Sequence, residues 1–189
     1  MEKCGASEVK EFSFKSGDYS FSILNLGCAV TSIQCPDRNG NIENVVLPFH
    51  DGVSNPSKLL HTNPFFGMTV GRFANRISGA SFELDDVEYS FPPNDGKNLL
   101  HSGPLGIWSR IWDVRKESDG FTCLLKVKDM EDGFPGDLDI RVRFSLSSDG
   151  VLRIHYSATS SKDCPLNVTN HTYFNLSGDP SNDVCGHVA

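Results

Sequence analysis

The chain of 189 residues is long enough to bury roughly 70% of the surface that its unfolded form exposes, so it can hold a hydrophobic core without disulfide staples. Its 17 basic and 24 acidic residues give a formal charge of −7, which argues against the basic stripe of a nucleic-acid binder. The six cysteines include no C-x-x-C pair, so neither a zinc knuckle nor a thioredoxin-type site is indicated, and the thiols are expected to be reduced.

The start of the chain, residues 1–8 (MEKCGASE), has no apolar run that could act as a signal peptide. No later segment approaches the ~20 consecutive apolar residues that a membrane-spanning helix needs. We therefore expect a cytoplasmic protein whose partner is neither a membrane nor a nucleic acid.

The first predicted strands lie near the N-terminus. Apolar side chains alternate with polar ones over residues 19–23, and a second apolar run reaches Ile33. Residues 36–41 (PDRNGN) then supply a turn, because Asn-Gly tolerates positive φ, and the short apolar run 45–47 follows. This pattern predicts a hairpin. Residues 48–64 contain two Asn-Pro pairs and no clear period, which is typical of a long loop.

Further alternating stretches follow in the second half of the chain. Residues 82–91 alternate on both sides of an Asp-Asp turn, and residues 121–127 form another strand pattern. The clearest pair is 138–146 and 152–158, joined by a turn at 148–150. No stretch of ~12 residues shows helical spacing. The prediction is therefore an all-β domain with antiparallel strands, a sandwich or a barrel.

Residues 166–178 (LNVTNHTYFNLSG) form the most informative stretch. A period of two places polar residues on one face and apolar residues on the other: Thr169, His171, Tyr173 and Asn175 against Val168, Phe174 and Leu176. We predict that the apolar face is buried. The polar face then presents an imidazole, which exchanges protons near neutral pH because its unperturbed pKa is near ~6.5. A single histidine in a strand is also often structural, and this alternative stays open for the stretch alone.

Two other segments group side chains that suit polar ligands. Residues 71–77 (GRFANRI) contain two arginines, each with a fork of donors, and an asparagine with a donor and an acceptor. For Arg72 the preferred interpretation is a pair with a surface carboxylate. Residues 98–108 (NLLHSGPLGIW) carry His101 into a glycine-rich turn that a ligand can approach closely. Trp108, taken singly, is expected to be core.

Together these residue types suggest proton chemistry on a neutral, polyhydroxylated substrate. The histidines form neither an H-x-H nor an H-E-x-x-H arrangement, which gives a metal site little support. There is also no G-x-x-x-x-G-K-[ST] and no glycine-rich loop that opens a helix, so a nucleotide is not implied.

Four motifs, in this order, resemble those of the aldose 1-epimerase family, the galactose mutarotases: GRFANRI at 71–77, LHSG at 100–103, GFPG at 133–136 and NHTYFNL at 170–176. The resemblance implies an antiparallel β-sandwich of the galactose mutarotase type. It also implies interconversion of the α and β anomers of a free hexose, such as galactose or glucose, by acid–base ring opening. No cofactor or metal is expected, because the reaction changes no oxidation state.

The resemblance implies roles for individual residues as well. His171 matches the family's general acid, which protonates the ring oxygen of the sugar. The residues that match substrate-binding positions are Asn75, Arg76, His101, Thr172 and Tyr173.

The sequence also departs from the family pattern. The family's general base is a glutamate in a C-terminal portion beyond these motifs, and no carboxylate of this chain matches it. We therefore expect residues 1–189 to form a single β-sandwich domain that is an N-terminal portion, truncated at the C-terminus. Ser102 stands where the family usually has glycine. The alternatives are a non-catalytic carbohydrate-binding module, an inactive truncated product and an epimerase of phosphorylated sugars. Monomer and weak dimer both stay open.

Overall fold

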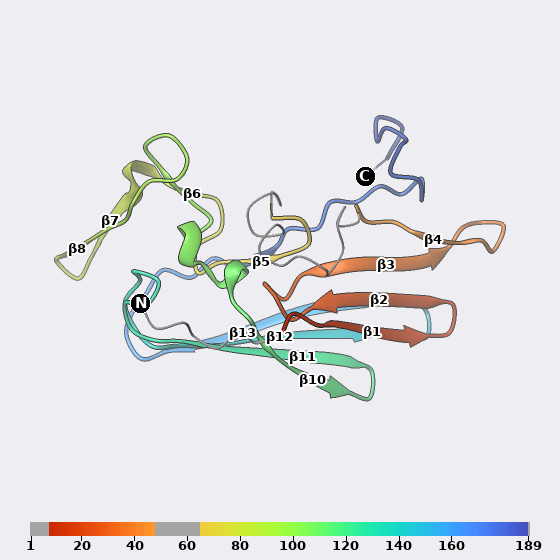
Figure 1. Cartoon of the computed structure of the whole chain (residues 1–189), viewed down its shortest axis with the longest axis horizontal. Helices are drawn as coiled ribbons and strands as arrows, with labels where there is room; N and C mark the ends of the chain where they lie inside the picture. The colour runs from red at the N-terminus through yellow and green to blue at the C-terminus, as the bar shows by residue number, and fades with distance from the viewer. Residues whose placement is uncertain (1–7, 48–64, 189) are drawn as a thin grey trace.

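The computed structural model describes residues 8–47 and 65–188, which form β-strands and short 3₁₀ turns. Two four-stranded antiparallel sheets lie face to face, with smaller two-stranded sheets beside them (Figure 1). The prediction of an all-β fold with antiparallel strands is confirmed. The loop that the sequence predicts over 48–64 lies outside the described residues.

The first sheet has the strand order β1-β2-β3-β4. The predicted hairpin is present, but its second strand begins ahead of the apolar run at 45–47. The reason is that the Asp37 carboxylate accepts hydrogen bonds from the backbone N–H groups of Asn39 and Asn41 and closes the turn there. The strands are β1 (Glu11–Ser16), β2 (Tyr19–Leu24), β3 (Val30–Pro36) and β4 (Ile42–Asn44).

The second sheet has the order β10-β11-β12-β13. Its longest pair runs from Leu138 opposite Ser160 to Leu146 opposite Leu152, which confirms the clearest predicted hairpin. The sequence patterns miss the edge strands β1 and β10. In β10 the reason is plain, because Val114 is its one apolar residue. The strands are β10 (Asp113–Glu117), β11 (Gly120–Val127), β12 (Leu138–Leu146) and β13 (Leu152–Ser160).

The main core lies between these two sheets. The ring of Phe21, from β2, lies 5.9 Å from that of Phe121 on β11 and 5.9 Å from that of Phe144 on β12. All three side chains are buried. Because each aromatic side chain buries on the order of 150–250 Å², these contacts hold the two sheets together.

Short elements beside the sandwich position the predicted site. β5 pairs with β14, β6 with β9, and β7 with β8, so β5 and β14, which are distant in the sequence, lie side by side (Figure 1). The β7–β8 pair confirms the hairpin predicted around the Asp-Asp turn. The elements are β5 (Thr69–Val70), β6 (Arg76–Ile77), η2 (Ser78–Ala80), β7 (Ser81–Leu84), β8 (Val87–Ser90), β9 (Leu99–Leu100), η3 (Gly103–Leu105), η4 (Ile107–Ser109) and β14 (Thr169–Asn170).

The predicted two-faced strand over residues 166–178 is wrong beyond Asn170. Beyond β14 the segment keeps an isolated antiparallel bridge, from Phe174 to Val46, but the covered face is not the predicted one. Phe174 and Leu176 are 53% and 59% exposed, whereas Asn175 is 4% exposed. The buried Asn175 amide is satisfied locally, because its Nδ2 donates to the carbonyls of Asp179 and Asn182.

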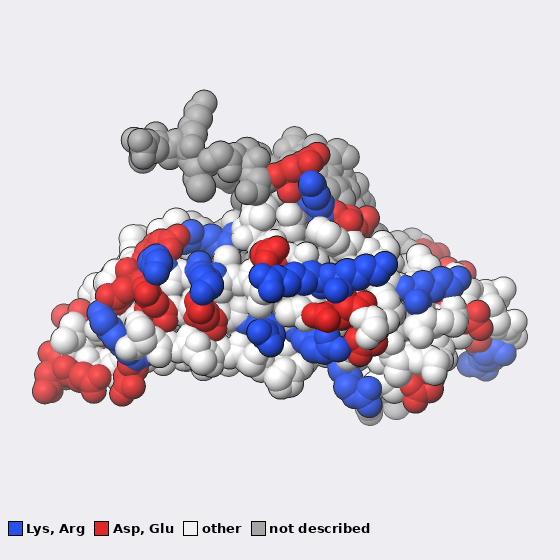
Figure 2. Space-filling view, turned by 90° about the horizontal axis from the view of Figure 1, so that it is seen from below, with Lys and Arg blue, Asp and Glu red and all other residues white. Residues whose placement is uncertain are grey.

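The described surface carries both charge signs. On the face in Figure 2, acidic and basic side chains are interspersed. Exposed ion pairs of the described residues include Lys126–Asp139 and Arg115–Asp113. Residues 8–47 and 65–188 include no helix with the length and apolarity to cross a membrane. Within the same ranges, no three His, Cys, Asp or Glu side chains gather where a metal ion could bind.

Candidate active site

The structure brings His101 and His171 together from distant parts of the chain. Their ring centroids lie 5.2 Å apart, with an angle of 86° between the ring planes. His101 follows β9, which pairs with β6, and His171 follows β14, which pairs with β5. Because β5 directly precedes the 71–77 motif and β6 forms its last two residues, these pairings place both imidazoles at one site.

His101 is held by reciprocal hydrogen bonds with Asn75. The His101 N–H donates to the Asn75 carbonyl (2.9 Å), and the Asn75 N–H donates to His101 Nδ1 (2.9 Å). Both residues have positive φ, 52° and 66° respectively, a conformation that costs energy and often accompanies functional sites. Since Nδ1 is an acceptor here, the neutral imidazole carries its hydrogen on Nε2.

The electrostatic surroundings keep His101 uncharged at neutral pH. Its side chain is buried among its neighbours, and the residue is 8% exposed. Burial, followed by repulsion from His171 and Arg76, lowers the pKa of His101 from 6.5 to about 4. At neutral pH the His101 Nε2–H can therefore donate a hydrogen bond, but the ring holds no extra proton to give.

His171 is anchored through its backbone and has a half-buried side chain. Its N–H donates to the Met68 carbonyl (2.9 Å), and its carbonyl accepts from the Gly67 N–H (2.9 Å). The ring of Tyr173 lies 5.1 Å from that of His171 and is itself 39% exposed. The imidazole and the phenol thus stand next to each other on a side of the site that solvent reaches.

Asn75 and Arg76 lie exposed at the start of β6. Arg76 Nη1 donates to Asn75 Oδ1 (3.1 Å), and Arg76 Nε pairs with the Asp95 carboxylate. These bonds hold an amide and a guanidinium beside the His101 imidazole. Asp95 has no role in the sequence-based prediction, and its place in a turn-rich stretch (PPNDG) did not distinguish it from other turn residues.

The structure places Thr172 next to the histidine, with its hydroxyl turned inward. The Thr172 N–H donates to Asn170 Oδ1 (3.1 Å). Over the described residues, Thr172 Oγ1 is buried without a hydrogen-bond partner. A sugar would therefore meet this hydroxyl only after the side chain rotates.

Arg72 does not pair with a surface carboxylate as the sequence suggested. Its partner is Asp132 (Nε to Oδ2, 2.8 Å), and both side chains are fully buried. Arg72 Nη1 also donates to the carbonyls of Pro135 and Gly136 (2.9 Å each). The correction has a physical reason: the 133–136 motif supplies acceptors that satisfy a guanidinium away from water.

Ser102 and Trp108 brace the His101 turn. Ser102 Oγ accepts from the Phe73 N–H (2.8 Å) and donates to the Phe73 carbonyl (3.2 Å), which ties this turn to the 71–77 motif. The expectation that Trp108 belongs to the core is confirmed, since it is 9% exposed. Trp108 Nε1 donates to the His101 carbonyl (3.1 Å).

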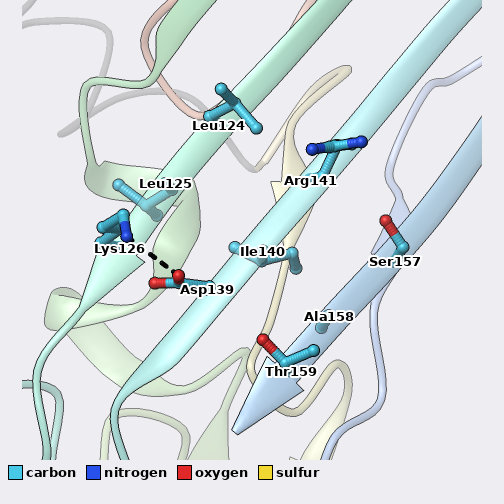
Figure 3. Close-up of a pocket in the computed structure, with 9 residues that line it drawn as sticks. All are labelled: Leu124, Leu125, Lys126, Asp139, Ile140, Arg141, Ser157, Ala158 and Thr159. Atoms are coloured by element: carbon cyan, nitrogen blue, oxygen red, sulfur yellow. Dashed lines mark hydrogen bonds and ion pairs between the residues drawn. The ribbon is translucent and has the colours of Figure 1, made fainter.

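Two of the surface grooves are lined by residues other than the two imidazoles. One of about 390 Å³ crosses β11, β12 and β13 (Figure 3), where Lys126 and Asp139 form an ion pair across the strands (2.9 Å). None of the predicted site residues lines it. The other, of about 430 Å³, is lined by Phe73, Phe82 and Arg76 among others. Arg76 therefore borders both the histidine site and this second groove.

The sequence model of the family described as aldose 1-epimerase matches residues 10–189. The chain belongs to the aldose 1-epimerase family. Galactose mutarotase from Sus scrofa is 37% identical over 97% of this chain and 52% of its own length. Aldose 1-epimerase from Escherichia coli (strain K12) is 34% identical over 88% of this chain and 47% of its own. The chain thus spans about half the length of the curated relatives it matches.

A solved structure supports the same family. The GalM/aldose epimerase homologue from C. elegans superposes with a TM-score of 0.83 at 29% identity, over 90% of this chain and 52% of that chain. The sandwich is therefore of the galactose mutarotase type, as the resemblance implied.

Three of the four aldose 1-epimerase motifs lie at the histidine pair, and the fourth lies on the side of the core. The motifs at 71–77, 100–103 and 170–176 meet at the histidine pair, whereas the motif at 133–136 supports Arg72 from the core side. Sequence reasoning missed Phe65, which contacts both imidazoles, and Asp132, which pairs with Arg72. Asp132 directly precedes the GFPG motif, and that position was the available signal.

Proposed function

We propose that this chain carries a sugar site of the aldose 1-epimerase type, at which the α and β anomers of a free hexose such as galactose or glucose interconvert. The observation that carries the proposal is the pair of imidazoles, 5.2 Å apart, beside Asn75, Arg76 and Tyr173. The activity named for the pig and bacterial relatives supports the same reading.

The chemistry requires a proton at one oxygen and its removal at another. A hemiacetal ring opens when the ring oxygen gains a proton while the anomeric hydroxyl loses one, and the aldehyde then rotates and closes on its other face. His171 is the proposed general acid, because its half-buried ring faces the open side and its backbone is anchored on both sides. The acid protonates the ring oxygen and takes the proton back on closure.

His101 is proposed to bind rather than to transfer a proton. With a pKa of about 4 it stays neutral, and its Nδ1 is occupied by the Asn75 N–H. Its Nε2–H is therefore a fixed donor for a sugar hydroxyl. Arg76, Asn75, Thr172 and Tyr173 are the further proposed contacts, which suit a neutral ligand rich in hydroxyl groups.

The general base is assigned to no residue of this chain. Among the residues that the structure describes, no carboxylate is hydrogen-bonded to either imidazole. Asp95 comes near through Arg76 but is bound to that guanidinium. A positioned general base typically accelerates such a reaction by ~10²–10⁴-fold. Because no base is assigned to the anomeric hydroxyl here, we expect this chain to catalyse mutarotation only slowly.

Polarimetry on freshly dissolved α-galactose tests the activity. We expect the 189-residue chain to accelerate mutarotation above a protein-free control, and His171→Ala to abolish the acceleration. His155→Ala, at an exposed position of β13, should keep the native rate. An acceleration that survives in His171→Ala would show that the acid is misassigned.

Sugar binding without turnover is a second candidate function, which is favoured because, over residues 8–47 and 65–188, no carboxylate is hydrogen-bonded to either imidazole. Titration with galactose, followed by NMR of the histidine ring protons, separates the two. Saturable shifts of the His101 and His171 signals without any acceleration would support a binding module. If neither shifts nor acceleration occur in the folded chain, the sugar site itself is refuted.

A further inference from the structure

The ring of Phe65 contacts aromatic side chains from three separate segments of the site. Its centroid lies 4.5 Å from the ring of His101, 5.0 Å from that of Trp108 and 6.0 Å from that of His171. The contacts with His101 and Trp108 are edge-to-face, at 69° and 86°, which is a favourable geometry for aromatic pairs. Both imidazoles therefore share one aromatic neighbour.

The wall behind Phe65 is rigid. Trp108 Nε1 donates to the carbonyls of His101 (3.1 Å) and Gly103 (3.0 Å), so the indole cannot turn without breaking two buried hydrogen bonds. A Cβ at Gly106 would lie 2.7 Å from the Trp108 ring, which shows how closely the indole is enclosed. Phe65 therefore packs edge-to-face against both the His101 imidazole and an indole that is held in place.

The backbone of Phe65 adopts a conformation that glycine would take at no cost. Its φ is +66°, and a non-glycine residue in the left-handed region is strained unless its surroundings compensate. The turn is closed by the Met68 N–H, which donates to the Phe65 carbonyl (3.1 Å). The compensating contacts come from the phenyl ring.

The same turn is bonded directly to the His171 segment. The Gly67 N–H donates to the His171 carbonyl (2.9 Å), and Asn170 Nδ2 donates to the Gly67 carbonyl (2.9 Å). A Cβ at Gly67 would lie 2.0 Å from the Val30 carbonyl oxygen, so the turn has no room to shift. The Phe65 ring and the His171 backbone are therefore parts of one rigid unit.

We propose that Phe65 is a positioning residue of this site: its ring holds the two imidazoles in their mutual orientation and excludes water from the space between them. That this geometry serves a sugar rests on the proposed function, but the geometry itself can be tested without a sugar. The competing interpretation is that Phe65, which is partly buried, only packs against a hydrophobic cluster that includes Met68 and Trp108.

The pKa of His101 measures how well the Phe65 ring keeps water away from the imidazole. The charged or titratable groups that act on its ring are His171 and Arg76, and Arg76 is itself paired with Asp95. Removal of the Phe65 ring leaves these groups in place and admits water. A rise in the pKa of His101 in a Phe65 variant therefore measures lost burial.

The test is a pH titration of the histidine ring protons by NMR on the 189-residue chain, with no sugar present. We expect Phe65→Ala to raise the pKa of His101 from about 4 by more than about one unit toward the ordinary value near ~6.5, and to shift the ring signals of both His101 and His171. Phe65→Tyr, which keeps the ring, should restore the native pKa.

The matched control is Phe14→Ala on β1, where another half-buried phenylalanine packs against Phe21 and Phe121, away from the site. This variant should leave the pKa of His101 unchanged. If Phe65→Ala does not fold, Phe65→Leu keeps the apolar bulk without the flat ring and should raise the pKa by a smaller amount. A native pKa in the folded Phe65 variants, or an equal rise in Phe14→Ala, would overturn the proposal.

These outcomes are independent of the proposed function. A raised pKa in Phe65→Ala together with an absence of galactose binding would refute the sugar site and leave the positioning role intact. The reverse pattern, saturable galactose binding with an unchanged His101 pKa in Phe65→Ala, would refute the positioning role alone.

Discussion

His101 shows that a residue's charge state depends on what surrounds it. An isolated imidazole titrates near ~6.5, and sequence alone offers no other value. In the folded chain, burial and the neighbouring His171 and Arg76 lower the pKa of His101 to about 4. The structure therefore supplies a physical reason for His101 to stay neutral, which agrees with the separate roles that the family resemblance implies for the two histidines.

The lowered pKa of His101 predicts how stability changes with pH. Between about pH 6.5 and pH 4 the unfolded chain binds a proton at this histidine that the folded chain does not. The free energy of unfolding should therefore fall as the pH is lowered through this range. We expect His101→Asn, which keeps an acceptor but cannot titrate, to show a shallower fall when urea midpoints are measured from pH 4.5 to 7.

The control for this measurement is His155→Asn, at an exposed position of β13, which should keep the native slope. Carboxylates such as Asp129 and Asp137 have lowered pKa values because they accept hydrogen bonds. The stability that they contribute is lost only as the pH falls below the pKa values of these carboxylates in the unfolded chain, near ~4. They therefore do not affect the slope measured from pH 4.5 to 7. Identical slopes for the native chain and His101→Asn would contradict the assignment.

Turn chemistry decides where the small hairpins form. Strand β7 pairs with β8 from Leu84 opposite Val87, so Asp85 and Asp86 alone make the connection. Both have positive φ, 51° and 60°. A two-residue turn with positive φ at both positions matches the twist of the strands and favours Asn-Gly. The sequence predicted this turn correctly, although aspartate is not its best residue.

The hairpin offers a stabilising substitution. Asp86→Gly should raise the free energy of unfolding by about 0.5–1 kcal/mol, because glycine adopts positive φ without steric cost. Scanning calorimetry would record this as a higher melting temperature. Asp86→Ala removes the same charge but keeps a Cβ, so it should bring no gain. An equal rise in both variants would mean that charge, rather than backbone conformation, limits the turn.

One buried ion pair joins the site to the sandwich at the scale of the whole molecule. Arg72 lies in the same 71–77 motif as Asn75 and Arg76, and Asp132 lies in the loop between β11 and β12. Asp132 Oδ1 also accepts from the Phe134 N–H (3.3 Å). The position of the site relative to the core therefore depends on a contact between residues far apart in sequence.

Removal of one partner of this pair should be costly. Asp132→Ala leaves the Arg72 guanidinium buried without its counter-charge, and we expect a loss of roughly 3–5 kcal/mol in the free energy of unfolding. Urea denaturation measures it. Asp113→Ala breaks the Arg115–Asp113 pair, whose side chains are 66% and 63% exposed, and should change stability little. Equal losses of unfolding free energy in Asp132→Ala and Asp113→Ala would show that burial does not determine how much an ion pair contributes to stability.

Much of the fold could be predicted from local patterns. The β7–β8 and β12–β13 hairpins were visible because alternation and turn residues are properties of adjacent residues. The same rule failed at residues 166–178, where Phe174 bridges to Val46 yet is exposed while Asn175 is buried. A local period cannot show which face of such a segment is covered, because its partners, β5 and Val46, are distant in the sequence.

By itself, the sequence determined the all-β class, the family motifs and the identity of the histidines, since each of these depends on residue type and short spacing. The tertiary structure decided which residues meet: Phe65 with both imidazoles, Arg72 with Asp132, and His101 with the neighbours whose burial of it lowers its pKa. The reason is that contact, burial and electric field arise between segments that are distant in the chain, and no local pattern contains them.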